Sequence, residues 1–217
     1  MSINPNALAK IKEELLPYNA TLVAVSKTKP VEDIQSLYNL GQRHFGENYV
    51  QELTDKQSQL AKDIHWHFIG HLQSNKVKFI APFVHLIHGV DSLSLLKEIN
   101  KEGVKNKKII DCLLQMYIAT EETKFGLNAE ELTEVMTKLD QFKNIEFKGL
   151  MGMASFSDDL NLVRNEFSSL RLLYSKHSQF SILSMGMSGD YKIAMEEGSN
   201  MVRIGSLLFG ERIYLKP

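Results

Sequence analysis

Short apolar runs that favour β-strands alternate with helix-like segments along the whole sequence. The first apolar run, residues 21–27, precedes residues 31–40, in which Val31, Ile34 and Leu37 recur at the 3.6-residue spacing of one helix face. No proline- or serine-rich linker and no low-complexity tract interrupts the alternation. The pattern predicts eight strands, at residues 21–27, 44–48, 65–70, 84–90, 108–119, 145–153, 180–187 and 201–205. It predicts helices at residues 5–16, 31–40, 49–60, 74–80, 92–102 and 129–139.

Eight parallel strands with intervening helices close naturally into a TIM-type barrel, which usually takes about 250 residues. An open doubly wound sheet also alternates strands and helices, but it usually carries a glycine-rich turn after its first strand. In this chain the corresponding turn, residues 27–30, contains no glycine. We therefore predict the α/β class, with a single TIM (β/α)8 barrel domain over residues 1–217.

The charge balance points to a small-molecule partner. The 25 basic and 26 acidic residues give a formal net charge of −1, which predicts binding neither to nucleic acid nor to a membrane. The sequence contains neither the features of a signal peptide nor a run long enough to cross a bilayer, and we expect a cytoplasmic protein. The single cysteine, Cys112, excludes an internal disulfide, suits a reducing compartment and is predicted to be a buried structural thiol.

The first predicted strand ends at Lys27, the position from which a barrel strand presents a reactive group at the C-terminal mouth. Apolar surroundings disfavour an ammonium ion, so the neutral amine can attack an aldehyde and form a Schiff base. A solvated surface lysine is the ordinary alternative, and it is the role that we expect of the neighbouring Lys29.

Two turns near the end of the chain contain small and hydroxyl-bearing residues that suit a phosphate. Ser188 follows the seventh predicted strand, while Gly205 and Ser206 follow the eighth. Hydroxyls and backbone N–H groups at helix starts attract anions, and helix capping by the serines is a compatible alternative. An aldehyde-reactive lysine together with a phosphate cradle suggests pyridoxal 5′-phosphate (PLP).

Arg203 lies two residues before Gly205, so strand alternation places both on one face of the eighth strand. A buried guanidinium needs a partner, and an ion pair with a carboxylate is the common solution. If a pyridine ring lies between Lys27 and the phosphate turns, its nitrogen is the alternative partner. An arginine there would keep the nitrogen unprotonated and the ring a weak electron sink, suited to limited proton chemistry or to no turnover.

Other residues at predicted strand ends each have two interpretations. His65, His67 and His71 suggest a metal, but the residues around them supply too few further ligands, so we predict no metal site and a pocket-lining or core role. Asn48 could contact the cofactor or cap the next helix. Met187 is close enough to the phosphate turn to touch a ring, although the methionines of this strand most simply fill the barrel.

Six sequence blocks resemble the pyridoxal phosphate homeostasis protein family, namely residues 24–30, 45–49, 67–76, 124–126, 183–190 and 202–206. The resemblance covers nearly the whole chain and implies a TIM barrel similar to the N-terminal domain of alanine racemase. It also implies PLP held as an aldimine on Lys27, with Arg203 at the ring nitrogen. The implied phosphate ligands are Ser188, Gly205 and Ser206, and the implied pocket residues are Asn48, His67 and Met187. The family often has threonine where this chain has Ser206, and serine keeps the hydroxyl.

The resemblance further implies a carrier or regulator of intracellular PLP, which affects amino-acid and keto-acid balance and exchanges the cofactor with PLP-dependent apoenzymes. We expect no catalytic residues and no robust catalysis. Alanine racemase takes one of its two bases from a second domain and a neighbouring subunit. Because this chain ends at Pro217, we expect no such domain, and we expect a monomer. The alternatives are a PLP-dependent racemase or lyase of low activity and a Schiff-base aldolase acting on a sugar phosphate.

Overall fold

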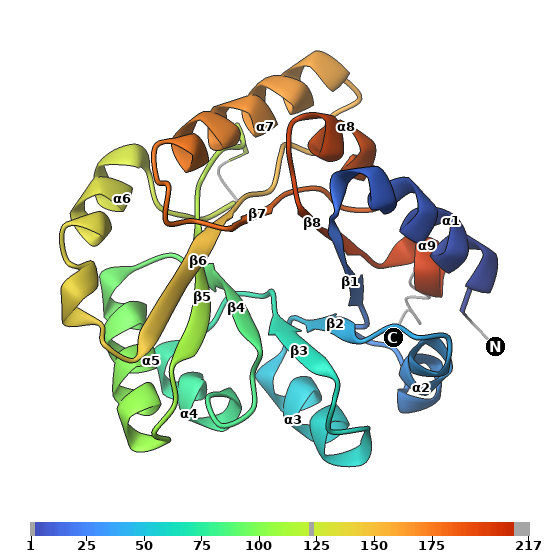
Figure 1. The fold of residues 1–217 in the computed structure, drawn as a ribbon, viewed down its shortest axis with the longest axis horizontal. Coiled ribbons are helices and arrows are strands. Elements are labelled where there is room, and N and C mark those ends of the chain that lie inside the picture. The colour runs from blue at the N-terminus through green and yellow to red at the C-terminus, as the bar shows by residue number, and fades with distance from the viewer. Residues whose placement is uncertain (1–2, 122–123, 211–217) are drawn as a thin grey trace, which may run out of the picture.

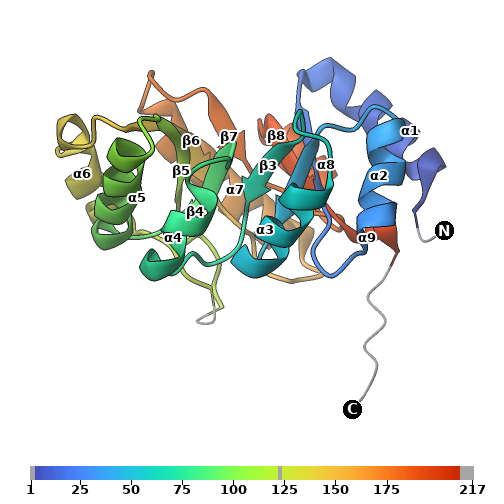
Figure 2. The same cartoon turned by 90° about the horizontal axis from the view of Figure 1, so that it is seen from below.

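The computed structural model, which describes residues 3–121 and 124–210, is a closed barrel of eight parallel strands with helices around its outside (Figure 1, Figure 2). The strands follow one another in sequence order, and β8 closes the circle by pairing in parallel with β1. The predicted TIM barrel is therefore confirmed, and an open doubly wound sheet is wrong. The strands are β1 (Thr21–Val25), β2 (His44–Glu47), β3 (His65–Phe68), β4 (Leu86–Val90), β5 (Ile110–Gln115), β6 (Ile145–Met151), β7 (Ile182–Ser184) and β8 (Met201–Ile204).

The helices connect consecutive strands and cover the outer face of the barrel (Figure 1). They are α1 (Pro5–Leu15), α2 (Val31–Asn39), α3 (Val50–Gln59), α4 (Val77–Ile80), α5 (Leu93–Lys105), α6 (Ala129–Met136), α7 (Leu160–Ser175), α8 (Tyr191–Glu196) and α9 (Ser206–Phe209). Short 3₁₀ helices occupy Leu16–Tyr18, Ser74–Lys76 and Leu139–Gln141. None of the helices in the described ranges has the length and apolar character needed to cross a bilayer. The expectation that no second domain follows is based on the chain end at Pro217, and residues 211–217 lie outside the described residues.

Every strand is shorter than its predicted range, and the difference is largest for β5 and β7. The run 180–187 forms a strand only over Ile182–Ser184, and the run 108–119 only over Ile110–Gln115. After β7 the chain turns at Gly186, whose φ of 89° suits glycine and cannot continue an extended strand. A Cβ at this position would lie 2.6 Å from the Cβ of Ala194, so the turn also packs closely on α8. The carbonyl of Gly186 still accepts from the backbone N–H of Arg203 in β8 at 3.0 Å, and the residues after Gly186 turn away to form the mouth of the barrel.

Helix α7 has no counterpart among the predicted helices. Its N-cap is Asp159, whose side chain accepts hydrogen bonds from the backbone N–H groups of Asn161 (2.9 Å) and Leu162 (3.3 Å). Val163, Phe167 and Leu170 are buried along one face at helical spacing. This capping residue and this spacing are the signals in the sequence that could have revealed the helix.

Two apolar layers stabilise the barrel. The larger lies between the strands and the helices and includes Ile34, Leu37 and Phe167. It also contains Cys112, which is fully buried as predicted and whose thiol pKa is raised by burial. The smaller layer fills part of the barrel interior and consists of Val23, Leu86, Leu113, Met151 and Met201. Burying each large aliphatic side chain contributes about 1.5–3 kcal/mol to folding.

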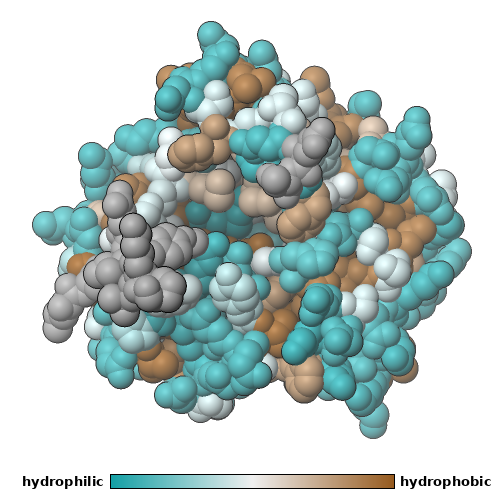
Figure 3. Space-filling view, turned by 180° about the vertical axis from the view of Figure 1, so that it is seen from behind, coloured by the Kyte–Doolittle hydropathy of each residue, from teal (hydrophilic) through white to brown (hydrophobic). Residues whose placement is uncertain are grey.

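The C-terminal ends of the strands open on one face of the molecule, which is hollowed near its centre (Figure 3). Close backbone approach at Gly70 lets the chain segments that follow β2 and β3 meet there, because a Cβ on Gly70 would lie 2.3 Å from the carbonyl oxygen of Asn48. A second close approach lies at the start of β7, where a Cβ on Gly149 of β6 would lie 1.8 Å from the carbonyl oxygen of Ile182. Glycine at these two positions allows the neighbouring backbones to pack closely.

Candidate functional site

Lys27 lies in a tight turn directly after β1, where its side chain is half-buried. The backbone N–H of Lys29 donates to the carbonyl of Ser26 at 3.0 Å and closes the turn. Thr28 has a φ of 63°, a left-handed conformation that costs a non-glycine residue about 1–2 kcal/mol. Lys29 is not simply a solvated lysine as expected, because it is half-buried and its Nζ donates to the carbonyl of Phe209 at 2.8 Å.

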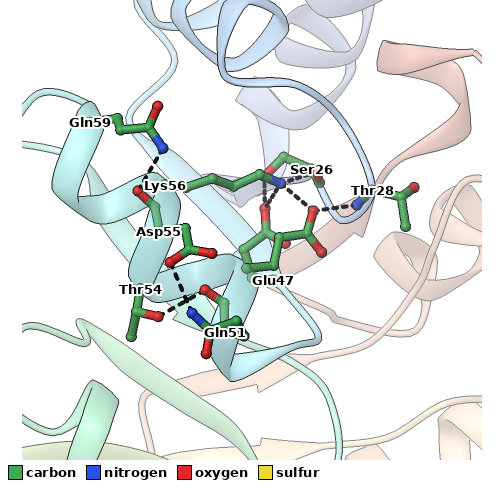
Figure 4. A network of polar contacts seen from close by, with 9 residues as sticks. Ser26, Thr28, Glu47, Gln51, Thr54, Asp55, Lys56 and Gln59 are labelled. Atoms are coloured by element: carbon green, nitrogen blue, oxygen red, sulfur yellow. Dashed lines mark hydrogen bonds and ion pairs between the residues drawn. The ribbon is translucent and has the colours of Figure 1, made fainter.

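A buried ionic network holds the strand side of this turn (Figure 4). Lys56, on α3, donates from Nζ to the carbonyl oxygen of Ser26 and to Oε1 of Glu47, both at 2.8 Å. The hydroxyl of Ser26 donates to the same Oε1 at 2.6 Å. We call Ser26, Glu47 and Lys56 the turn clamp, because together they fix the residue that precedes Lys27.

The residue that follows Lys27 is held from the same helix. Glu52, on α3, accepts at Oε1 from the backbone N–H of Thr28 and from Nζ of Lys56, both at 2.6 Å. These charge-assisted bonds stabilise the left-handed conformation of Thr28. Both neighbours of Lys27 are thus attached to α3, and the lysine is presented at the mouth from a fixed backbone.

Burial governs the ionisation of the turn clamp. It raises the pKa of Glu47 to about 7, although Lys56 and Ser26 act in the opposite direction. The second carboxylate oxygen, Oε2, is buried and finds no hydrogen-bond partner among the described residues. Glu47 therefore changes charge near neutral pH.

The turns after β7 and β8 lie side by side, as the phosphate prediction requires. The Ser188 hydroxyl oxygen accepts a hydrogen bond from the backbone N–H of Gly205 at 3.3 Å. Asp190 fixes the first turn by accepting from the N–H of Met187 at 2.6 Å. A Cβ on Gly189 would meet no atom within 4 Å, so open space lies over this turn. Ser206 begins α9 immediately after the second turn and is exposed.

Arg203 points into the barrel and is only 4% exposed. Its NH1 donates to the carbonyl oxygen (2.9 Å) and the hydroxyl oxygen (2.6 Å) of Ser184, and its NH2 donates to the carbonyl oxygen of Gly152 (3.0 Å). These bonds use three of the five N–H groups of the guanidinium. Burial lowers the pKa of Arg203 to about 10, while the more distant Asp190 opposes that shift. Within the described part of the chain no carboxylate forms an ion pair with it.

Two more predicted residues lie at the same mouth. Asn48 follows β2, and its side-chain Oδ1 is buried without a hydrogen-bond partner in the described ranges. An unpartnered buried acceptor requires an explanation, and a ligand that donates to it is one. Met187 is 37% exposed at the turn after β7, so its thioether is accessible from the mouth.

His67 lies elsewhere, in the interior of the barrel. It is fully buried, and its ring nitrogens bond to two other histidines, with Nε2 2.9 Å from Nδ1 of His44 and Nδ1 2.8 Å from Nε2 of His88. His71 is separate from it and exposed, with Nδ1 3.3 Å from a carboxylate oxygen of Asp91. The structure thus places His67 in the barrel core and away from His71, while its role as a pocket residue stays a prediction.

Sequence reasoning missed the residues that support the site. Ser184 and the two acidic residues that hold the turn, Glu47 and Glu52, were not singled out. Lys56 was also missed, because a lysine in the middle of a polar helix gives no sign of burial. Glu47 did carry a signal, since an acidic residue inside an apolar strand seldom stays buried without a partner.

The chain matches the family model described as alanine racemase, N-terminal domain, over residues 6–213. It is 42% identical over 201 residues to the pyridoxal phosphate homeostasis protein of Aquifex aeolicus, which covers 90% of this chain and 88% of that protein. It is 39% identical over 228 residues to the protein of the same name from Homo sapiens, with 97% and 83% covered.

Solved structures show the same fold. PipY of Synechococcus elongatus, determined with PLP bound, superposes with a TM-score of 0.88 at 32% identity and covers 95% of this chain and 99% of its own. Alanine racemase from Bartonella henselae, with covalently bound pyridoxal phosphate, gives a TM-score of 0.73 at 17% identity, with 98% of this chain and 62% of the racemase covered. This second likeness concerns the fold alone.

Proposed function

The chain belongs to the family of pyridoxal phosphate homeostasis proteins, and on this premise we propose that it binds PLP at the C-terminal mouth of the barrel and buffers or delivers that cofactor. The observation that carries the proposal is the convergence of three groups on one mouth. A lysine held by the turn clamp, a buried arginine and two adjacent small-residue turns all stand at the ends of neighbouring strands.

The residues at the mouth fit the parts of PLP. Lys27 would hold the aldehyde carbon, and Arg203 would donate to the ring nitrogen. The phosphate would lie on the turns of Ser188 and of Gly205 and Ser206. The open space over Gly189 and the unpartnered Oδ1 of Asn48 support a ligand at this position, because both are features that a bound molecule would use.

The position of Arg203 supports PLP binding without robust catalysis. PLP, when bound, supplies an electron sink for reactions at the α-carbon of an amino acid. A guanidinium can only donate hydrogen bonds, so it favours a ring nitrogen that carries no proton. The unprotonated ring withdraws electrons weakly, and we infer that turnover of amino acids is slow or absent.

The open mouth supports release of the cofactor. Met187, Gly189 and Ser206 are exposed, so the phosphate position can be reached from solvent. A site that holds PLP through a fixed lysine yet leaves the phosphate end accessible suits reversible loading and transfer to PLP-dependent apoenzymes. His67 would act on this site only through its bonded neighbours in the barrel interior.

The first experiment compares the absorption spectra of the wild type, Lys27→Ala and Lys62→Ala after incubation with PLP. Borohydride reduction followed by peptide mass analysis then locates any pyridoxyl group. We expect a yellow wild type with the group on the Lys27 peptide, an unlabelled Lys27→Ala protein, and a Lys62→Ala control that behaves like the wild type because Lys62 is exposed. A wild type that stays colourless, or labelling spread over surface lysines, would refute the site.

The racemase fold makes a low-activity racemase or lyase the second candidate. Incubating the PLP-loaded protein with amino acids in deuterated solvent distinguishes a binding protein from such an enzyme. A racemase or lyase exchanges the α-hydrogen of its amino acid for deuterium. We expect exchange no faster than that of free PLP with the same amino acids. Exchange that is much faster and that disappears in Lys27→Ala would establish an enzyme.

A further inference from the structure

Five histidines lie close together in the barrel interior and at its N-terminal end, which is opposite the proposed PLP site. They are His44 on β2, His65 and His67 on β3, His85 immediately before β4, and His88 within β4. The ring centroids of contacting pairs lie 4.4–5.7 Å apart. Branched aliphatic side chains usually fill a TIM barrel, and the other part of this interior is filled by aliphatic residues and methionines. Histidines are therefore unusual residues in this position, and their presence indicates a chemical role.

We propose that His44, His67 and His85 bind a divalent transition-metal ion such as Zn²⁺. One ring nitrogen from each of the three lies within 4.8 Å of the others. Zinc–nitrogen bonds of about 2.0–2.1 Å in a tetrahedral site place ligand nitrogens about 3.4 Å apart. Nδ1 of His44 and Nε2 of His67 stand 2.9 Å apart, so on metal binding these two nitrogens would separate by about 0.5 Å and the exposed His85 ring would move toward them.

Neutral imidazole suits a metal because one of its two ring nitrogens carries no proton. The hydrogen bond between Nδ1 of His44 and Nε2 of His67 contains one proton. When a metal binds to both nitrogens, that proton moves to another ring nitrogen or is released to solvent.

A hydrogen-bond network already supports the central ligand. Nε2 of His67 faces His44, and its Nδ1 lies 2.8 Å from Nε2 of His88. Nδ1 of His88 lies 3.3 Å from the hydroxyl of Ser184, which also accepts from Arg203 at 2.6 Å. Metal-binding histidines generally donate their second ring N–H to such a partner, which fixes the tautomer and the ring orientation.

A metal ion can reach this place and complete its coordination there. His85 is exposed, and His44 lines a pocket of about 370 Å³ between α1 and the starts of β1 and β2. A fourth ligand is available from water or from His65, whose Nδ1 lies 3.3 Å from Nε2 of His44 and whose ring stacks on His85 at 4.4 Å. Three histidines with an open fourth position form a common zinc site.

Carboxylates offset part of the positive charge at this rim. Lys108 and Lys148 act on His85 with positive charge. Carboxylate oxygens of Asp111 and Glu146 stand 3.8 Å and 3.7 Å from Nζ of Lys148.

Lys12 and Arg43 also line the pocket beside His44, and Nε of Arg43 pairs with a carboxylate oxygen of Asp63 at 3.0 Å. A dication that enters there therefore meets positive charge that is only partly compensated.

The test uses the full chain without a histidine tag, dialysed against a chelator and free of PLP, so its outcome does not depend on the proposed function. Zn²⁺ binding is measured by calorimetry, and Co²⁺ binding by the visible absorption of a tetrahedral site. The wild type is compared with His44→Gln, His85→Gln and a His177→Gln control, because His177 lies outside the histidine group.

We expect one equivalent of metal to bind to the wild type and to the control, and affinity to fall at least tenfold in His44→Gln and His85→Gln. His88→Gln, which removes only the partner of His67, should weaken binding about 10–100-fold without changing the stoichiometry. Circular dichroism of each variant shows whether the barrel is intact, and the exposed His85 is the position at which folding is least at risk. The proposal is wrong if the wild type binds no stoichiometric metal, or if both ligand variants bind as well as the control.

Discussion

Replacing Lys56 by methionine tests whether the turn clamp is an ion pair on which the fold depends. The Lys56 side chain is only 6% exposed, and the Glu47 side chain that it contacts is fully buried. Methionine has a similar volume but cannot donate to Glu47, to the carbonyl oxygen of Ser26 or to Glu52. Removing one partner of a buried pair generally costs about 3–5 kcal/mol, because the remaining charge keeps its desolvation penalty without compensation.

The pH dependence of this cost follows from Glu47. Its pKa is about 7 in the folded protein, against 4.5 as its usual value, so the folded state binds the proton more tightly. This carboxyl therefore makes folding less favourable as pH rises from about 4.5 to about 7, and the loss is complete above the folded pKa. Without Lys56 the pKa of Glu47 in the folded protein rises further. The free energy of unfolding then continues to fall above pH 7, at about 1.4 kcal/mol per pH unit. The destabilisation by Lys56→Met should thus be about 1.4 kcal/mol larger at pH 8 than at pH 6.

Urea unfolding at pH 6 and at pH 8 measures this difference. The double variant Lys56→Met/Glu47→Gln lacks the buried Glu47 carboxyl, so the fall in stability that Glu47 causes between the two pH values should disappear. Its stability should exceed that of Lys56→Met at pH 8. Lys101→Met is the matched control, because Lys101 pairs with Glu98 on an exposed face, where ion pairs contribute about 0–1 kcal/mol. A pH-independent loss in Lys56→Met, or no recovery in the double variant, would show that Glu47 is not the charge that Lys56 compensates.

Three further substitutions test other parts of the barrel. Gly149→Ala places a Cβ 1.8 Å from the carbonyl oxygen of Ile182 and should lower the free energy of unfolding by about 3 kcal/mol or more. An unchanged midpoint of urea unfolding would contradict the close approach of β6 and β7. Ser188→Ala should weaken PLP binding about tenfold in a fluorescence titration while leaving the stability of the PLP-free protein within about 1 kcal/mol, because it removes the hydrogen bond that we propose Ser188 makes to the phosphate. Arg203→Met should lower the stability of the PLP-free protein by about 2–4 kcal/mol, since buried oxygens lose charge-assisted bonds. Equal or greater stability in that variant would mean that those oxygens find other donors.

The sequence by itself determined the barrel and the residues at its mouth. Strand-like and helix-like runs alternate through local periodicity, and a residue just after a parallel strand must lie at the C-terminal end of the barrel. Lys27, Asn48, Ser188 and Gly205 could therefore be placed before any coordinates were known. Alternation, which is a local property, also placed Arg203 and Gly205 on one face of their strand, but it did not decide whether that face is the barrel interior.

Only the tertiary structure decided which side chains became partners. The histidine group shows this most clearly, because the sequence pairs His67 with His71, whereas the barrel brings His44 and His85 to His67 from neighbouring strands. The partner of Lys56 was equally invisible, since its burial depends on how α3 packs over β2. Contacts between strands depend on register and barrel closure, and these follow from the packing of the whole chain rather than from any local pattern.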